Sequence, residues 1–161
     1  MGTEERLFDQ LSKLSNSRTL VLTMCNTLKG DDAIGPLLYE RLKGKIDTEI
    51  IDAGTVPENY IQTIVKKAPD NLLIIDAIDF GASAGAIQIF KPCQLNSLVI
   101  STHSLSPRIF VDMITNEIDI QVYFLGIQPL QTQIGYPLST AVDKAAKQLI
   151  SILTKVFGPC E

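Results

Sequence analysis

The sequence predicts a single α/β domain, a three-layer sandwich in which helices flank a mostly parallel, twisted sheet of about five strands. Short aliphatic runs alternate along the chain with segments whose apolar residues recur at helical spacing, which is the pattern of βαβ units. The chain has 161 residues, of which 45% are hydrophobic and 20% charged. That length and composition suit one domain over residues 1–161, with residues 1–18 as an N-terminal extension.

The first half of the chain predicts three strands and two helices. Compact aliphatic runs indicate strands at Thr19–Met24, Thr48–Asp52 and Asn71–Ile75. A turn-rich stretch at 26–32 precedes a helix over Ala33–Leu42, which carries its apolar residues on one face. Pro57 and Glu58 open the second helix, because proline and an acid both suit a first helical turn. The third strand is apolar on both faces, which is typical of a central parallel strand.

The second half predicts two more strands and two more helices. A shorter strand is expected at Ala86–Phe90, for which an antiparallel orientation is one option. A helix follows over Pro107–Ile114, the last strand lies within Ile118–Ile127, and a long amphipathic helix over Leu138–Phe157 closes the domain.

Charge and composition exclude several classes of protein. Lys and Arg total 14 and Asp and Glu total 18, so the net charge of −4 argues against a nucleic-acid partner. No apolar run reaches the length that crosses a bilayer, which predicts no membrane insertion. The acidic residues near the N-terminus do not fit an export signal, and three scattered cysteines do not fit a disulfide framework. The expected location is therefore the cytoplasm.

Acidic residues gather after the predicted strands, at the edge where parallel sheets place their sites. Asp31 and Asp32 follow the first strand, Asp52 ends the second, and Asp76 and Asp79 follow the third. His103, the only histidine, lies in a later loop. Carboxylate oxygens with one imidazole nitrogen indicate a site for a divalent metal such as nickel, zinc, cobalt, iron or manganese.

Each of these residues also has a simpler interpretation. Asp31 or Asp32 suits the cap of the following helix, and Asp76 suits a cap in a loop. A lone histidine is often a hydrogen-bonded structural residue. Glycine-rich phosphate loops, a GxSxG elbow and an HExxH helix are all absent from the sequence. Spacing alone therefore predicts an α/β domain with a carboxylate–imidazole metal site and nothing more specific.

Five segments in a fixed order carry a family resemblance. They read NTLKGDDAIGP from Asn26, DAGTVPEN from Asp52, LLIIDAIDFG from Leu72, STHSL from Ser101 and FLGIQP from Phe124. In this order the chain resembles the hydrogenase maturation endopeptidases, close to the subgroup that processes the hydrogenase of formate hydrogenlyase complexes. The resemblance covers roughly residues 19–155.

The resemblance implies a function and a site. The implied activity is one cut that removes the C-terminal tail from the large-subunit precursor of a nickel–iron hydrogenase after nickel insertion. The implied metal contacts are Asp32, Asp76 and His103, with Asp32 and Asp76 as the catalytic residues and Asp31 as a cap or support. The implied metal is nickel supplied by the precursor, for which other divalent metals can substitute.

Two departures and several alternatives stay open. Cys25 and Ala33 stand where many members have glycine, which puts the shape of the first loop in question. Asp79 or Asp31 is a candidate general base, and Asn26 or backbone amides are candidate oxyanion donors. The alternative functions are a nickel-checking protein that does not cut, a self-sufficient small-molecule metallohydrolase, and a structural domain whose acids are only caps.

Overall fold

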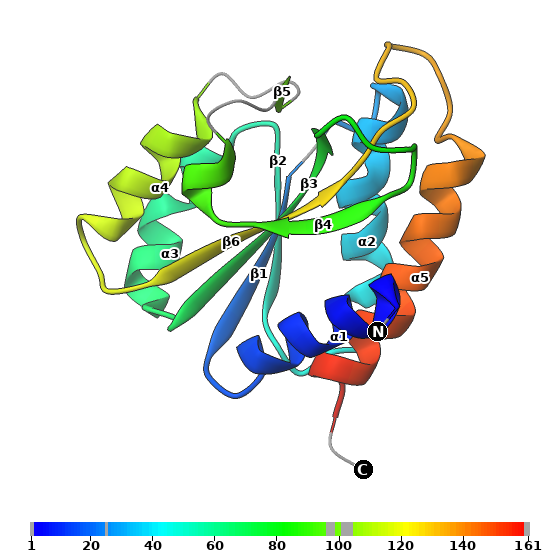
Figure 1. The fold of residues 1–161 in the computed structure, drawn as a ribbon. Helices are drawn as coiled ribbons and strands as arrows, with labels where there is room; N and C mark the ends of the chain where they lie inside the picture. The colour runs from blue at the N-terminus through cyan, green and yellow to red at the C-terminus, as the bar shows by residue number, and fades with distance from the viewer. Residues whose placement is uncertain (1, 25, 96–98, 101–104, 160–161) are drawn as a thin grey trace.

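A twisted sheet with helices on both faces forms the molecule (Figure 1). The computed structural model describes residues 2–24, 26–95, 99–100 and 105–159. The main path of the sheet has the strand order β2-β1-β3-β6-β4. The strands are β1 (Thr19–Met24), β2 (Ile50–Gly54), β3 (Asn71–Asp79), β4 (Ile87–Phe90), β5 (Val99–Ile100) and β6 (Gln121–Ile127). Strands β2, β1, β3 and β6 are parallel to one another. Strand β4 pairs with β6, and β5 pairs with the end of β3, both in the antiparallel direction.

The helices divide between the two faces (Figure 1). One face is covered by α1 (Thr3–Leu14), α2 (Ile34–Leu42) and α5 (Thr140–Phe157). The opposite face is covered by α3 (Ile61–Lys67) and α4 (Pro107–Thr115). The described residues also contain three short 3-10 helices: η1 (Gly30–Ala33), η2 (Pro57–Tyr60) and η3 (Pro92–Leu95). Ser106 and Ser139 cap α4 and α5, since each hydroxyl accepts a backbone N–H of the first helical turn.

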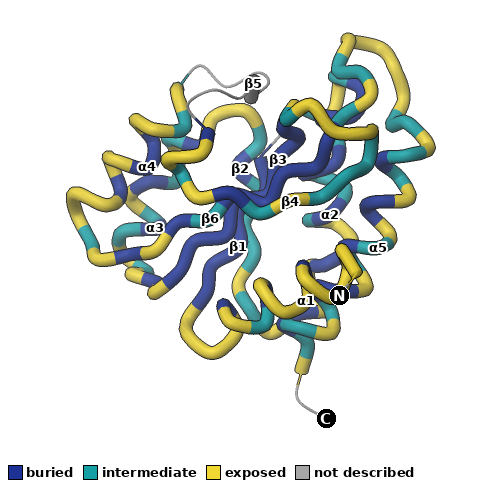
Figure 2. Tube along the Cα trace, viewed as in Figure 1, coloured by how far each residue is buried: buried dark blue, intermediate teal, exposed yellow. Residues whose placement is uncertain are grey.

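The core consists of two apolar layers that the sheet separates. Successive side chains of β3 alternate between them: Leu73 and Ile75 face α2 and α5, while Leu72 and Ile74 face α3 and α4. Figure 2 shows buried residues along the central strands and exposed residues along the outer loops. This burial on both faces explains why the segment from residue 71 is apolar without alternation.

Most predicted elements are confirmed, with three corrections. The structure continues β3 to Asp79, so the prediction that Asp76 and Asp79 follow the strand is wrong. Pairing with β6 through Ala77 and with β5 at Ile78 and Asp79 extends the strand past its apolar run. Likewise β2 ends at Gly54, so Asp52 lies inside the strand and does not end it.

The stretch at 26–32 was predicted as a turn, but its second half forms η1, which leads directly into α2. The strand at 87–90 is antiparallel, the option that the sequence left open. The segment before β1 contains α1, a helix of 12 residues.

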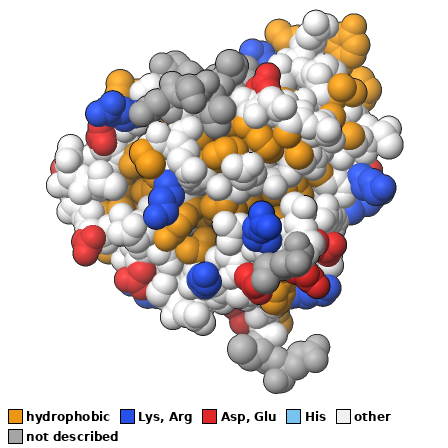
Figure 3. Space-filling view, in the orientation of Figure 1, with side chains coloured by type: hydrophobic (Ala, Val, Ile, Leu, Met, Phe, Trp, Pro, Cys, Tyr) orange, Lys and Arg blue, Asp and Glu red, His pale blue; other side chains and the backbone are white. Residues whose placement is uncertain are grey.

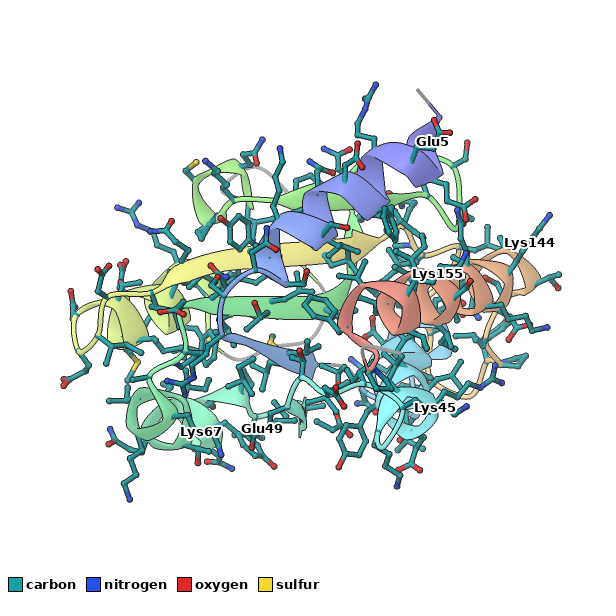
Figure 4. All side chains as sticks on the ribbon, turned by 90° about the horizontal axis from the view of Figure 1, so that it is seen from below. Glu5, Lys45, Glu49, Lys67, Lys144 and Lys155 are labelled. Carbon is teal, nitrogen blue, oxygen red and sulfur yellow. The ribbon has the colours of Figure 1, made fainter. Side chains whose placement is uncertain are left out.

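Figure 4 shows the layers from below, with α3 on the opposite side of the sheet from α5. In that view Lys67, at the end of α3, forms an ion pair of 2.7 Å with Glu49 before β2. No helix in the part of the chain that the structure describes is long and apolar enough to cross a membrane.

Candidate functional site

Asp32 and Asp76 are buried at the edge where β1 ends, with 0% and 1% of their surface exposed. Asp32 lies in η1, which packs against β3, the strand that carries Asp76. Asp76 lies one residue beyond the last pair between β1 and β3, Thr23 with Ile75. Both carboxylates interact with other groups. The fold therefore brings together two aspartates that are 44 positions apart in the sequence.

The sheet fixes the side on which Asp76 presents its carboxylate. Asp76 points to the same face of the sheet as Ile74 and Ile78, which lie two residues before and after it in β3. Both of these belong to the core layer under α3 and α4. Its partner on β6 is Gly126, where a Cβ would come within 3.0 Å of Ile78 and Phe90. A larger residue there would require Ile78 and Phe90 to shift, because their side chains pack closely over the strand beside Asp76.

The carboxylate of Asp31 joins η1 to the loop before α5 through hydrogen bonds on both of its oxygens. One carboxylate oxygen accepts the backbone N–H of Leu130 at 2.7 Å, that of Gln131 at 3.1 Å and the hydroxyl of Ser139 at 2.9 Å. The other oxygen accepts the backbone N–H of Ser139 at 2.7 Å. Asp31 is completely buried, and it caps neither η1 nor α2, whose N-cap positions are Lys29 and Ala33. The prediction of a helix cap is therefore wrong for Asp31, because the loop before α5 supplies all four donors.

Gly30 makes the same junction possible from the backbone side. It has a φ of +53°, and a Cβ there would lie 2.7 Å from the carbonyl oxygen of Gln131. The next residue, Asp31, donates its N–H to that same carbonyl at 2.9 Å. The left-handed conformation and the close approach both require glycine. This junction fixes the position of η1 and hence of Asp32.

Gln128 forms a second junction, at the end of β6. Its Oε1 accepts the N–H groups of Phe80 and Ala82, and its Nε2 donates to Asp79 at 3.0 Å. Asp79 also accepts the N–H of Gly81. The hydrogen bond from Gln128, followed by that from Gly81, holds the pKa of the exposed Asp79 carboxyl below its usual value. Asp79 is therefore held as an anion in a structural turn.

Asp52 also has local structural contacts. One of its oxygens accepts the hydroxyl of Thr23 on β1 at 3.1 Å and the N–H of Gly54 at 3.3 Å. These contacts join the ends of β1 and β2 where the register between the strands shifts. Asn26 has a similar role, because its Oδ1 accepts the N–H of Leu28 and closes the turn after β1.

Glu58 is a candidate that the sequence did not single out. Its Oε2 is a buried side-chain oxygen that lacks a hydrogen-bond partner among the residues described. Glu58 lies in η2, directly after β2, and the chain continues from there into α3. The helix α3 that follows covers the face of the sheet to which Ile74 and Ile78 point. A buried carboxylate oxygen without a donor is costly, which is typical of a group that meets a proton or a cation.

His103 and Cys25 lie outside the described residues. Among the described residues, no group of three His, Cys, Asp or Glu side chains is arranged to hold a metal ion. The three-ligand site of Asp32, Asp76 and His103 therefore stays a prediction. The described part contributes two buried aspartates at this edge, Asp32 and Asp76. Carboxylate oxygens are groups that divalent metals accept as ligands.

Comparisons with known proteins agree with this architecture. A family model described as hydrogenase maturation protease, HycI, matches residues 33–156. The hydrogenase 3 maturation protease of Escherichia coli strain K12 is 34% identical over 131 residues, which cover 80% of this chain and 83% of that protein.

Solved structures give the same result. The crystal structure of a [NiFe] hydrogenase maturation protease HycI from Thermococcus kodakarensis has a TM-score of 0.80 and 29% identity, and the match covers 91% of this chain and 97% of that one. The solution structure of an endopeptidase HycI from Escherichia coli has a TM-score of 0.76 and 32% identity, with coverage of 85% and 89%.

Proposed function

The chain belongs to the hydrogenase maturation protease family and is therefore a peptidase, and on that premise we propose that it cuts the C-terminal tail from the large-subunit precursor of a nickel–iron hydrogenase once nickel is in place. One observation carries the assignment to this site. Two aspartates from separate elements, Asp32 and Asp76, are buried at the carboxyl edge of the sheet.

Nickel enters this proposal as part of the substrate. We place Asp32 and Asp76 as oxygen ligands that meet the metal when the precursor docks, with His103 as the third ligand. Oxygen and imidazole ligands suit a divalent nickel ion, and other divalent metals fit the same set. The protein then needs no resident metal, because the precursor delivers it.

Burial gives the site its selectivity in this account. Asp32 and Asp76 are already almost completely buried, and two like charges in that environment are unfavourable when the docked precursor brings no cation. With nickel present the same two groups attract the incoming metal. The discrimination between loaded and empty precursor comes from this difference in electrostatic free energy.

The cut itself requires a water molecule and a group that accepts its proton. A bound metal supplies polarisation of the peptide carbonyl and a lower pKa for a bound water. Of the two bases considered from sequence, Asp31 has both oxygens occupied by loop donors, and Asp79 has a lowered pKa that makes it a weaker base. Glu58 fits the role better, since its Oε2 is buried and has no donor among the described residues.

The proposal is tested by incubating the purified protein with nickel-loaded precursor and measuring the mass of the product. The wild-type protein is expected to remove one C-terminal peptide. Asp76→Asn is expected to leave the precursor uncut while keeping the melting temperature of the wild type. Tight binding of the precursor by the wild type without any cut would favour a nickel-checking role. Normal processing by Asp76→Asn would exclude Asp76 as a ligand.

A further inference from the structure

A groove separates α1 from β4 on the side of the molecule away from β2. It has a volume of about 560 Å³ and is lined by one stripe of α1 and by the outer edge of the sheet. Figure 3 shows hydrophobic side chains across the middle of this face, with Lys and Arg side chains beside them and both basic and acidic side chains toward the periphery. The floor includes Ile87 and Ile89 of β4, which pack against the core layer under α1 and α5.

Among the described residues, the charged side chains that line the groove are all basic. Arg6 and Lys13 come from α1, and Lys91 follows β4, while no described Asp or Glu lines the groove. None of these three side chains forms an ion pair with any residue that the structure describes. The whole chain has a net charge of −4, so the charge of this basic surface is opposite in sign to that of the chain. Its charge is complementary to an acidic partner.

The outer edge of β4 carries backbone groups that point away from the sheet. The N–H of Gln128 donates to the carbonyl of Ala86 at 2.8 Å, and Gln88 is paired with Gly126. Alternation in an antiparallel pair therefore turns the N–H and C=O groups of Ile87 and Ile89 outward. Within the described residues these groups form no backbone hydrogen bond outside the strand ladders. An extended peptide can pair with such an edge as an added strand.

Protection of an edge strand explains only part of this arrangement. A short strand flanked by lysine is a common way to prevent aggregation, and Lys91 fits that role. Arg6 and Lys13, however, belong to a separate helix on the other wall of the groove. Two walls that contribute cations, above an open strand edge, are typical of a surface that binds a peptide.

We propose that this groove binds an extended acidic segment of the hydrogenase large-subunit precursor, which pairs with β4 and places its carboxylates against Arg6, Lys13 and Lys91. This inference rests on the proposed function for the identity of the partner. In the sheet, Gln88 pairs with Gly126 and Gly126 with Asp76. A peptide strand added beside β4 would therefore be three strand spacings away from the strand that carries Asp76. That separation is about 14 Å across the sheet, which roughly five extended residues cover.

The groove is suited to choosing the precursor, because its lining residues include neither Asp32 nor Asp76. A change of charge in the groove therefore leaves the two aspartates at the carboxyl edge in place. The groove is thus a specificity surface, and its residues take no part in the reaction.

The test compares two triple variants that change the charge equally. The groove variant is Arg6→Glu, Lys13→Glu and Lys91→Glu. The control variant is Lys45→Glu, Lys144→Glu and Lys155→Glu, whose lysines are exposed, lie outside the groove and are labelled in Figure 4. KM and kcat are measured with nickel-loaded precursor, and the dissociation constant is measured with the same changes added to Asp76→Asn, so that the complex is not consumed.

The groove variant is expected to raise KM and the dissociation constant roughly tenfold or more, with kcat unchanged, and the control is expected to resemble the wild type. Equal values for the groove variant and the wild type, or an equal loss in both triple variants, would overturn the inference. Failure of the wild type to cut the precursor would instead contradict the proposed function. The dissociation constants would still decide whether the groove binds the precursor.

Discussion

The carboxyl edge of the sheet and the groove beside β4 carry opposite charges in opposite environments. At the edge, Asp32 and Asp76 are almost completely buried. At the groove, Arg6, Lys13 and Lys91 are exposed. Buried charges are costly and are kept where they do chemistry, whereas exposed charges steer association.

This difference separates the two kinds of kinetic effect. Changes at the edge are expected to lower kcat, because they remove groups that meet the metal or move a proton. Changes at the groove are expected to raise KM alone. The following predictions test this separation, beginning with the largest expected effect.

Asp32→Asn is expected to abolish processing. The amide keeps the size of the side chain but removes the charge that meets nickel, which costs several kcal/mol of transition-state stabilisation or roughly a thousandfold in rate. Single-turnover cleavage of nickel-loaded precursor measures the loss, and a melting curve checks the fold. A rate within a factor of three of the wild type would show that Asp32 does not meet the metal.

Asp31→Asn is expected to act on stability instead. An amide nitrogen placed against backbone N–H donors leaves several buried groups unsatisfied, at a cost of about 3 kcal/mol. Urea denaturation of Asp31→Asn and Asp32→Asn side by side measures the difference between these neighbouring carboxylates. Equal stabilities would contradict the role of Asp31 in joining η1 to the loop before α5.

Glu58→Gln is expected to slow the cut by roughly tenfold to a hundredfold, the size of a general-base contribution at the low end. KM should stay the same, because Glu58 does not line the groove. Glu49→Gln is the matched control, since Glu49 is an exposed partner of Lys67. A normal kcat for Glu58→Gln would exclude it as the base.

Asp79 is expected to give the smallest effect, confined to acid conditions. Its pKa is lower in the folded protein than in the unfolded chain, so its contribution to stability is present above the usual carboxyl pKa and is lost as the pH falls through the lowered value. Asp79→Asn should therefore match the wild type in stability once the pH is below the lowered pKa of Asp79, and be slightly less stable at neutral pH. Melting temperatures across that pH range provide the measurement.

The sheet could be predicted from sequence because its strands are continuous apolar runs. Thr19–Met24 was predicted to the residue, and the start of β3 at Asn71 was also correct. The end of β3 was missed because Asp76 and Asp79 are polar, and only pairing with β5 and β6 keeps them in the strand. Long-range pairing of this kind leaves no local signal.

The site could be predicted only in part, for a similar reason. The rule that parallel strands gather their ends at one edge predicted that several aspartates lie there, and the family resemblance singled out Asp32 and Asp76 among them. The role of Asp31 did not follow, because its donors lie about a hundred residues further along the chain. Glu58 carried a signal in the acid that follows Pro57 after β2, but that signal also fits an ordinary helix start.

The most direct test of the account compares matched precursors with and without nickel. Each is incubated with the wild-type protein, and mass spectrometry follows the release of the C-terminal peptide over time. If the buried carboxylates recognise nickel by binding it, the nickel-loaded precursor is cut and the nickel-free precursor stays intact. Cleavage of both precursors at the same rate would contradict the claim that Asp32 and Asp76 recognise nickel.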